Sequence, residues 1–332
     1  MSIDLTQAWN ALVAKGTMKN LFEDDSGRAI EAGVRMGALG PESYAIAVDT
    51  GVEICGPAEL TRFASGMEML FNPVGKLKPH TRPPKAGRQP DLKTEAAACP
   101  FGCQDADNPL SIRNRPSLAE VACPGLRWRA YPNVAPWEAR GLLVWLPCQP
   151  DLDGGELPHL PQALEQSHLE DFLTVARSAE GMATFFNSLH GGASANHLHF
   201  QSVYCDRLLA AESADRAVRG SYTFLCNYPA SGLVFPRDVP AQALWNPIEK
   251  IQSARYPLNL IGLSSGVYLF VRHPEHEILE EFPGRAFGAI NLAGLFITSD
   301  AEERKRVTEQ AIALAYGRLT IDRESLADLI GA

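Results

Sequence analysis

Two imidazoles and an amide alternate with apolar side chains in a short stretch past the middle of the chain. Residues 197–201 have the sequence HLHFQ, so His197, His199 and Gln201 occupy every second position. This alternation has the period of a β-strand and predicts three polar groups on one of its faces. An imidazole can act as a nucleophile at phosphorus or as a metal ligand, and many histidines are only structural. The pattern alone leaves catalysis, metal binding and a structural role open.

Small residues precede this stretch and favour the catalytic interpretation. Gly191, Gly192, Ala193 and Ser194 lie just upstream of the histidines. Such residues let backbone N–H groups approach an anionic ligand closely, as phosphate oxygens require. A phosphate-binding turn that leads into a strand of imidazoles indicates attack on phosphorus.

These residues together carry a resemblance to a known family. Residues 187–201 resemble the active-site strand of the histidine-triad superfamily in its transferase branch, whose pattern is Asn, a Gly/Ala-Ser segment and H-x-H-x-Q. That branch includes the galactose-1-phosphate uridylyltransferases, the diadenosine tetraphosphate phosphorylases and the GDP-L-galactose (GDP-hexose) phosphorylases. The sequence NHLHFQ is most similar to the last of these. The pattern falls on Asn187, Ser194, His197, His199 and Gln201.

The resemblance implies roles for the three residues of the strand. His199 is expected to attack the α-phosphate through one ring nitrogen, while its other nitrogen donates to a nearby backbone carbonyl. Gln201 is expected to hydrogen-bond a non-bridging oxygen without supplying a proton, which suits transfer better than hydrolysis. His197 is expected to bind a zinc ion or to support the geometry of His199.

The upstream residues are expected to hold the substrate. The backbone of Gly192, Ala193 and Ser194 would bind the α-phosphate, and Asn187 would orient the phosphate or the ribose. In the family, polar groups in this later region can face the acceptor or the nucleotide phosphates. Asn259 and Arg272 are the candidates here, and the alternative is an ordinary strand end.

The expected function is that of a nucleotidyltransferase or phosphorylase with a covalent nucleotidyl-histidine intermediate. Its substrate would be a nucleoside diphosphate sugar or a dinucleoside polyphosphate, and its acceptor inorganic phosphate or a sugar phosphate. The alternatives are a nucleotide hydrolase of the same superfamily and a non-catalytic nucleotide-binding or metal-binding sensor. The sequence leaves the base, the sugar, the acceptor and the oligomeric state open, with a homodimer among the candidates.

A zinc site is a further candidate, although the chemistry itself requires no cofactor. Cys99 and Cys103 have three residues between them, one more than the usual C-x-x-C pair. Uridylyltransferases of the superfamily often complete such a site with a His after the next long strand and with the first His of the active strand. Cys148 stands where that other His is expected, so the candidate ligands are Cys99, Cys103, Cys148 and His197. The alternative is a set of buried free thiols.

The charge, the hydropathy and the cysteine content of the chain limit its expected partners and its expected compartment. The formal net charge is −9, which argues against a nucleic-acid partner bound by broad phosphate neutralisation. No run of eighteen apolar residues and no secretory leader is evident, so no membrane partner is expected. The chain has seven cysteines, an odd number that fits reduced thiols in the cytoplasm better than a disulfide framework.

Hydrophobic periodicity predicts the elements that position the active stretch. A long helix is expected at residues 157–189 and a hairpin at residues 126–146. Other helices are expected at residues 4–22, 58–71, 300–316 and 322–330. Other strands are expected at residues 29–34, 44–48, 222–234 and 292–296, and a second hairpin with its turn at residues 264–266 is expected at residues 256–271.

A basic, proline-rich loop is expected at residues 78–90. It is either a solvated loop or a segment that closes over an anionic substrate through Lys78, Arg82 or Lys85.

The resemblance implies an α+β fold with two duplicated histidine-triad-like halves, in which antiparallel sheets are flanked by helices. Residues 1–90 would form an N-terminal portion that includes the basic loop. Residues 91–220 would form the catalytic half and residues 221–332 a degenerate second half. The sequence itself shows no clear internal repeat.

Overall fold

The computed structural model describes most of the chain from residue 117 onward. The described residues are 34–40 and 43–48 (backbone only), 59–71, 117–133, 141–148, 159–282 and 286–332, with Gln7, Ala11, Cys99, Phe101 and Cys103. The helix expected at residues 4–22, the strand expected at residues 29–34 and the basic loop at residues 78–90 lie largely or wholly outside these ranges. None of the described helices is long and apolar enough to cross a membrane.

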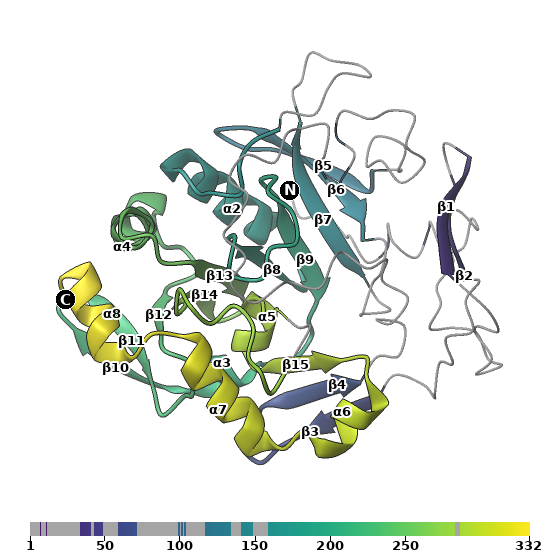
Figure 1. Cartoon of the computed structure of the whole chain (residues 1–332). Coiled ribbons are helices and arrows are strands. Elements are labelled where there is room, and N and C mark those ends of the chain that lie inside the picture. The colour runs from purple at the N-terminus through teal and green to yellow at the C-terminus, as the bar shows by residue number, and fades with distance from the viewer. Residues whose placement is uncertain are drawn as a thin grey trace.

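A ten-stranded sheet dominates the fold and consists of two halves with the same topology (Figure 1). The first half comprises β5 (Ala119–Ala122), β6 (Arg127–Pro132), β7 (Leu142–Cys148), β8 (Met182–Asn187) and β9 (Phe200–Tyr204). The second half comprises β10 (Asp215–Arg219), β11 (Tyr222–Cys226), β12 (Gly232–Phe235), β13 (Leu258–Leu263) and β14 (Gly266–Val271). Each half has the spatial order first, second, third, fifth, fourth, and the two fourth strands, β8 and β13, pair antiparallel at the centre.

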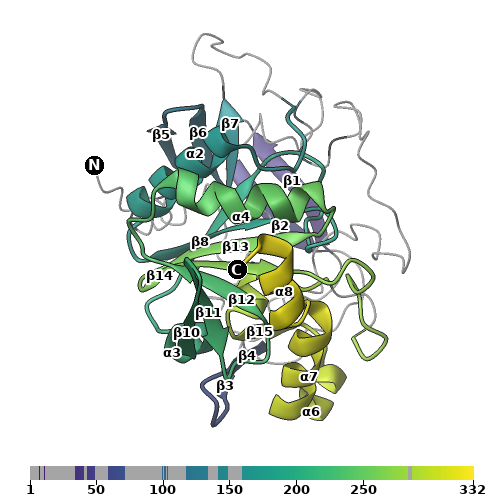
Figure 2. The same cartoon turned by 90° about the vertical axis from the view of Figure 1, so that its left-hand side faces the viewer.

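Each half also places one helix at the same point of its chain. α2 (Gln166–Ser178) connects β7 to β8, and α4 (Ala241–Ser253) connects β12 to β13. The two helices pack side by side on one face of the sheet (Figure 2). The structure therefore confirms the predicted duplication, which the sequence does not show as a repeat. The division predicted after residue 220 falls in the turn between β10 and β11.

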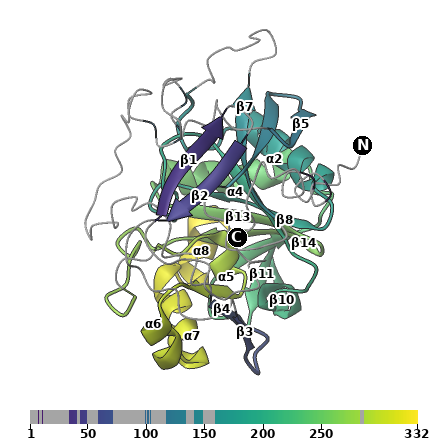
Figure 3. The ribbon, with the colours of Figure 1, turned by 90° about the vertical axis from the view of Figure 1, so that its right-hand side faces the viewer.

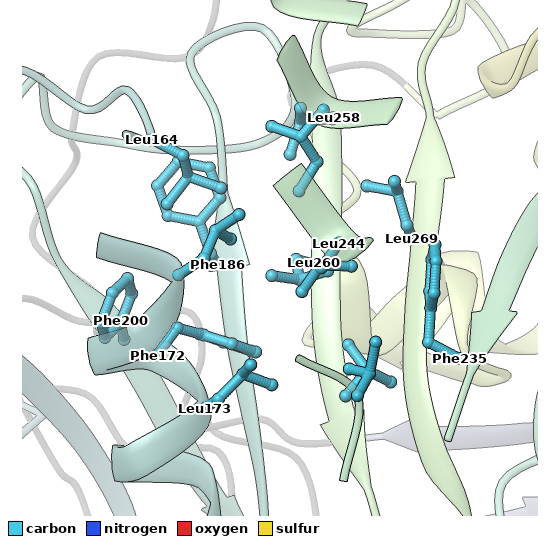
Figure 4. Close-up of a cluster of buried hydrophobic side chains, with 14 of the residues drawn as sticks. Leu164, Phe172, Leu173, Phe186, Phe200, Phe235, Leu244, Leu258, Leu260 and Leu269 are labelled. Atoms are coloured by element: carbon cyan, nitrogen blue, oxygen red, sulfur yellow. The ribbon is translucent and has the colours of Figure 1, made fainter. Parts of the chain in front are cut away.

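Two hydrophobic layers enclose the sheet. On the face covered by α2 and α4, Phe172, Phe186, Phe200 and Leu260 belong to one buried cluster (Figure 4). α8 (Arg323–Ile330) also contributes to this layer. The opposite layer contains α5 (Ala289–Leu292), α7 (Glu309–Leu319) and the short α3 (Ala210–Ser213).

A small three-stranded sheet belongs to the second layer and corrects one prediction. β3 (Glu59–Arg62) and β4 (Glu68–Phe71) form an antiparallel pair, and β4 runs parallel to β15 (Leu295–Thr298). The helix predicted at residues 58–71 is therefore wrong. Gly66 has a φ of +84° in the intervening turn, a backbone conformation that glycine adopts readily, and the partner strand β15 lies far away in the sequence.

The long helix predicted at residues 157–189 is also only partly correct. α2 ends at Ser178, and Gly181 with a φ of +72° leads the chain into β8. β8 is buried along nearly its whole length, and its mostly apolar sequence MATFFN does not alternate regularly between polar and apolar residues. A short segment of this kind fits a helix or a strand equally well by periodicity.

The hairpins and the C-terminal helices confirm their predictions. β6 pairs with β7 and β13 pairs with β14, as expected for residues 126–146 and 256–271. α6 (Ala301–Arg306) begins after Asp300 and α8 after Asp322, and each Asp side chain accepts hydrogen bonds from backbone amides of the first turn. Thr308 separates α6 from α7, so the helix predicted at residues 300–316 is divided in two. β1 (Val34–Gly40) and β2 (Ser43–Val48) form a separate hairpin (Figure 3).

Candidate active site

The two halves share their strand order but differ strongly at the connection between the fourth and fifth strands, and in the first half that connection holds the candidate site. Residues 188–199 join β8 to β9, whereas Ser264 and Ser265 alone join β13 to β14. The small-residue turn and both histidines are thus an elaboration of the first half. The strand itself begins at Phe200, so His197 and His199 precede it, contrary to the prediction of a strand over residues 197–201.

The predicted alternation of side chains nevertheless holds. Leu198 and Phe200 are fully buried in the layer under α2, where the Phe200 ring stacks on Trp128 at 4.1 Å. This apolar anchoring turns His199 and Gln201 away from that layer. The Gln201 side chain makes no hydrogen bond with any part of the protein that the structure describes, so its amide remains available to a ligand.

His199 has the geometry that a nucleophilic imidazole needs. Its side chain is 3% exposed, and its Nδ1 lies 2.7 Å from the backbone carbonyl oxygen of His197. Because a carbonyl can only accept, Nδ1 carries the proton and Nε2 keeps its lone pair. Burial lowers the pKa of His199 to about 4, so the imidazole is neutral near pH 7. The expected hydrogen bond to a nearby carbonyl is thus present.

Gln162 holds the backbone of His199 and was not identified from the sequence. Its side-chain Oε1 accepts from the amide of His199 at 2.9 Å, and its Nε2 donates to the carbonyl oxygens of Asn187 and His199 at 2.8 and 3.2 Å. Gln162 is 2% exposed, and its backbone amide donates to Asn196 Oδ1. A buried amide with both ends engaged fixes the ends of β8 and β9 relative to each other. Its position in the loop before α2 gave no signal in the sequence.

Replacing Gln162 with Ala is expected to lower kcat about 10–100-fold, because displacement of a nucleophile by about 1 Å has effects of this size. The buried carbonyls left without a donor should also reduce the free energy of unfolding by about 1–3 kcal/mol. Steady-state kinetics and denaturant unfolding measure the two effects.

Gln252 offers a matched control for this variant. Its side chain engages the backbone of Leu164 at both ends, at 3.1 and 2.9 Å, in the same manner. Gln252→Ala should lose comparable stability but keep kcat within about 3-fold. Equal losses of kcat in both variants would contradict a specific role for Gln162.

The small-residue turn leaves two amides free for an anion. The carbonyl oxygen of Ser188 accepts from the amides of Gly191 and Ala193 at 2.9 and 3.3 Å. The amides of Gly192 and Ser194 make no hydrogen bond among the described residues, and the Ser194 side chain is exposed. Gly192 has a φ of +97°, and a Cβ there would lie 2.7 Å from the carbonyl oxygen of Phe287, so the turn requires glycine at this position.

Asn187 is partly engaged within the protein. Its Oδ1 accepts from Asn259 Nδ2 at 2.7 Å and from the amide of Ala289 at 2.8 Å, which leaves only its Nδ2 group for a ligand. Asn259 and Arg272 are both 0% exposed. The expectation that these two side chains face the acceptor or the phosphates is therefore wrong, since they lie beneath the turn.

Four potential metal ligands converge beside the histidines. The donor atoms of Cys99, Cys103, His159 and His197 all lie within 4.8 Å of one another. Cys99 Sγ is 3.2 Å from His197 Nδ1, and Cys103 Sγ is 3.4 Å from His159 Nδ1. A tetrahedral zinc site has sulfur–nitrogen edges of about 3.5 Å, so this set of two thiols and two imidazoles fits zinc. Phe101 packs edge-on against both His197 and His199.

The structure places His159, and not Cys148, in this group. Cys148 is buried in the same small cluster as Cys99 and Cys103, but its thiol is not one of the four convergent donors. Burial raises the pKa of the Cys148 thiol, which keeps it protonated near pH 7. His159 lies further along the chain than the position at which the sequence pattern expects a His. The group thus contains two cysteines and two histidines, the composition expected for the zinc site, and residue 159 supplies one of the histidines.

The duplicated sheet, with the histidines on the connection between β8 and β9, has a fold that is also found among solved structures. Structures of yeast Ap4A phosphorylase Apa2 are among those similar to this chain. The complex of Apa2 with Ap4A has a TM-score of 0.58 at 12% identity and covers 97% of this chain and 98% of that chain. The corresponding values are 0.58, 10%, 97% and 95% for Apa2 alone, and 0.57, 11%, 97% and 98% for its complex with AMP.

At these identities the likeness establishes a shared fold. No known protein family and no curated protein matches the sequence. The chemical argument therefore depends on the residues of the site itself.

Proposed function

We propose that the protein is a nucleotidyltransferase or phosphorylase that cleaves a nucleoside diphosphate sugar or a dinucleoside polyphosphate. The observation that carries this proposal is the orientation of His199. A buried, neutral imidazole whose Nδ1 is held by the His197 carbonyl presents Nε2 as a nucleophile.

In the first step, Nε2 of His199 attacks the α-phosphorus. A phosphorus–nitrogen bond forms, and the bond from phosphorus to the bridging oxygen breaks with its electron pair on the leaving phosphate. That group is a sugar phosphate or a nucleotide, which is stable as an anion and needs no proton. The product on the protein is a nucleotidyl-histidine at His199.

In the second step, an oxygen of inorganic phosphate or of a sugar phosphate attacks the same phosphorus and releases His199. The Gln201 amide hydrogen-bonds a non-bridging oxygen in both steps, and the amides of Gly192 and Ser194 bind the charge that develops on the phosphoryl group. Asn187 Nδ2 orients the phosphate or the ribose. Two successive displacements on one imidazole require ping-pong kinetics.

The fold shared with Apa2 supports a nucleotide substrate, since that enzyme was solved with Ap4A and with AMP. The sequence NHLHFQ supports a nucleoside diphosphate hexose as the other substrate class. A cytoplasmic location and a homodimer remain predictions from the sequence.

We also propose that Cys99, Cys103, His159 and His197 bind one structural zinc ion. Four protein ligands would complete a tetrahedral site and leave no position for substrate, so the metal would supply rigidity and no chemistry. The zinc ion would then fix the imidazole of His197, and the backbone carbonyl of His197 would fix the tautomer of His199.

A substrate panel tests the proposed reaction. GDP-hexoses, UDP-hexoses and Ap4A are incubated with the protein, each with and without inorganic phosphate, and the products are separated by ion-exchange chromatography. We expect cleavage of at least one of them to depend on phosphate and to yield a nucleoside diphosphate. Equal cleavage without phosphate would instead establish a hydrolase, and tight binding without any cleavage a nucleotide sensor.

A further inference from the structure

A completely buried arginine lies beneath the candidate site. Arg272 follows β14 and is 0% exposed. Its Nε donates to the carbonyl oxygen of Leu319 at 3.1 Å, and its Nη2 to that of His276 at 3.4 Å. Its Nη1 donates to Asn259 Oδ1 at 3.2 Å and to the carbonyl oxygen of Phe287. All four acceptors are neutral.

The charge of this guanidinium is not neutralised by a direct ion pair. Among the described residues, no carboxylate oxygen lies within ion-pair distance of Arg272. Glu277 is the acidic residue that acts on it through space, and Glu277 Oε2 itself contacts His190 Nδ1 at 3.2 Å. Burial lowers the pKa of Arg272 to about 10, so the side chain still carries its charge near pH 7.

Asn259 connects this charge to the phosphate-binding turn. Its Oδ1 accepts from Arg272, while its Nδ2 donates to the carbonyl oxygen of Gly191 at 2.6 Å and to Asn187 Oδ1 at 2.7 Å. The Phe287 carbonyl that Arg272 binds is also the atom against which Gly192 packs. The turn therefore rests on two groups that Arg272 holds, and roughly 8 Å separates the guanidinium from the Gly191 backbone along this chain of contacts.

We propose that Arg272 is a positioning residue whose buried, unpaired positive charge, transmitted through Asn259, prepares the turn at residues 187–194 for a polyanionic phosphate ligand. The inference rests on the proposed function, since it concerns the binding of its substrate. Burying a charge without a counter-ion is unfavourable, and an apolar side chain of similar size would avoid that cost. The bound phosphate itself would supply the missing counter-ion.

The effect should grow with the charge of the ligand. At a separation of roughly 10 Å and an effective dielectric constant of about 20, one buried positive charge strengthens binding on the order of tenfold per unit of ligand charge. A purely structural role would not produce this dependence, because a distorted turn would weaken all ligands alike.

The test measures binding of orthophosphate, pyrophosphate and tripolyphosphate by isothermal titration calorimetry at a fixed ionic strength. In Arg272→Gln, the loss of affinity should increase along this series and reach at least tenfold for pyrophosphate. Arg272→Lys keeps the charge but loses part of the guanidinium donor set, so it should retain more affinity for pyrophosphate than Arg272→Gln does. Arg177→Gln, which removes an exposed arginine of α2, is the matched control and should bind all three ligands normally.

A second variant leaves the guanidinium in place. Asn259→Asp puts a carboxylate against Arg272 and should weaken pyrophosphate binding at least tenfold, even if Arg272→Gln does not fold. Wild-type affinity for pyrophosphate in Arg272→Gln or in Asn259→Asp would overturn the inference, as would an equal loss for all three ligands in Arg272→Gln.

Failure of the inference can be distinguished from failure of the proposed function. If the wild type forms a nucleotidyl adduct on His199 while these variants bind normally, only the role of Arg272 is wrong. If the wild type neither forms an adduct nor binds any of the three anions, the proposed function and the role of Arg272 are both wrong.

Discussion

His199→Ala should lower phosphate-dependent cleavage by about 10⁴-fold or more, because loss of a covalent nucleophile removes both displacement steps. Substrate binding should persist, since the amides of the turn and the buried Arg272 are unchanged. The measurement is single-turnover cleavage of the best substrate from the panel, together with its Kd for the variant. Truncation of a buried imidazole can also destabilise the fold, so the thermal midpoint is measured alongside.

His168→Ala provides the matched control. His168 is 8% exposed, and its Nδ1 accepts from the amide of Glu165 at the N-terminus of α2, away from the site. We expect this variant to lose about 1 kcal/mol of stability and to keep its cleavage rate within about 3-fold. A His199→Ala protein that still cleaves at more than one-hundredth of the wild-type rate would contradict the role of His199.

Cys103→Ser should release the bound metal and destabilise the protein by on the order of 3–5 kcal/mol, since a structural zinc contributes directly to folding. We expect one zinc per wild-type chain by elemental analysis and much less in Cys103→Ser and His159→Ala. Cleavage should also fall, because His197 would lose its metal contact and its carbonyl positions His199. Complete removal of zinc from the wild-type protein by a chelator should lower its thermal midpoint to that of Cys103→Ser.

Cys148→Ser distinguishes the convergent group of potential ligands in the structure, which contains His159, from the set predicted from sequence, which contains Cys148. Cys148 lies outside the convergent group, so this variant should keep its zinc. Loss of zinc from Cys148→Ser to the same extent as from Cys103→Ser would support the predicted set with Cys148. A wild-type protein that purifies without metal and is unaffected by chelators would rule out both sets.

The local geometry of the candidate site could be predicted from sequence because it is encoded within a few neighbouring residues. His197, His199 and Gln201 alternate within five residues, and the apolar residues between them are buried as that alternation requires. The expected orientation of His199, with one ring nitrogen on a backbone carbonyl, depends on His197 two positions away. Short-range patterns of this kind are largely independent of the rest of the fold.

The elements that failed to follow prediction are those whose pairing is long-range. β4 pairs with β15, more than two hundred residues further along the chain, and no local pattern distinguishes this from the predicted helix. β8 lies at the centre of the ten-stranded sheet, and hydrophobic layers cover both faces of that sheet, so its side chains are buried on both sides. Periodicity is uninformative for such a strand.

The residues that position the candidate site could not be predicted from the sequence either. His159 and Gln162 come from the loop before α2 and Arg272 from the end of β14, and each acts on residues 187–199 through contacts between residues far apart in the sequence. Asn259 and Arg272 belong to the second half of the duplicated sheet. In that half only Ser264 and Ser265 join β13 to β14, yet its residues lie beneath the phosphate-binding turn of the first half.

In the proposed reaction, His199 carries the nucleotidyl group between donor and acceptor. Intact-protein mass spectrometry detects this covalent intermediate after incubation with GDP-hexose, UDP-hexose or Ap4A in the absence of phosphate. We predict a mass increase equal to one nucleoside monophosphate, located on His199 by peptide mapping, absent from His199→Ala and discharged on addition of phosphate. Phosphate-dependent cleavage by a wild-type protein that never forms this adduct, or an adduct on another residue, would contradict this role of His199.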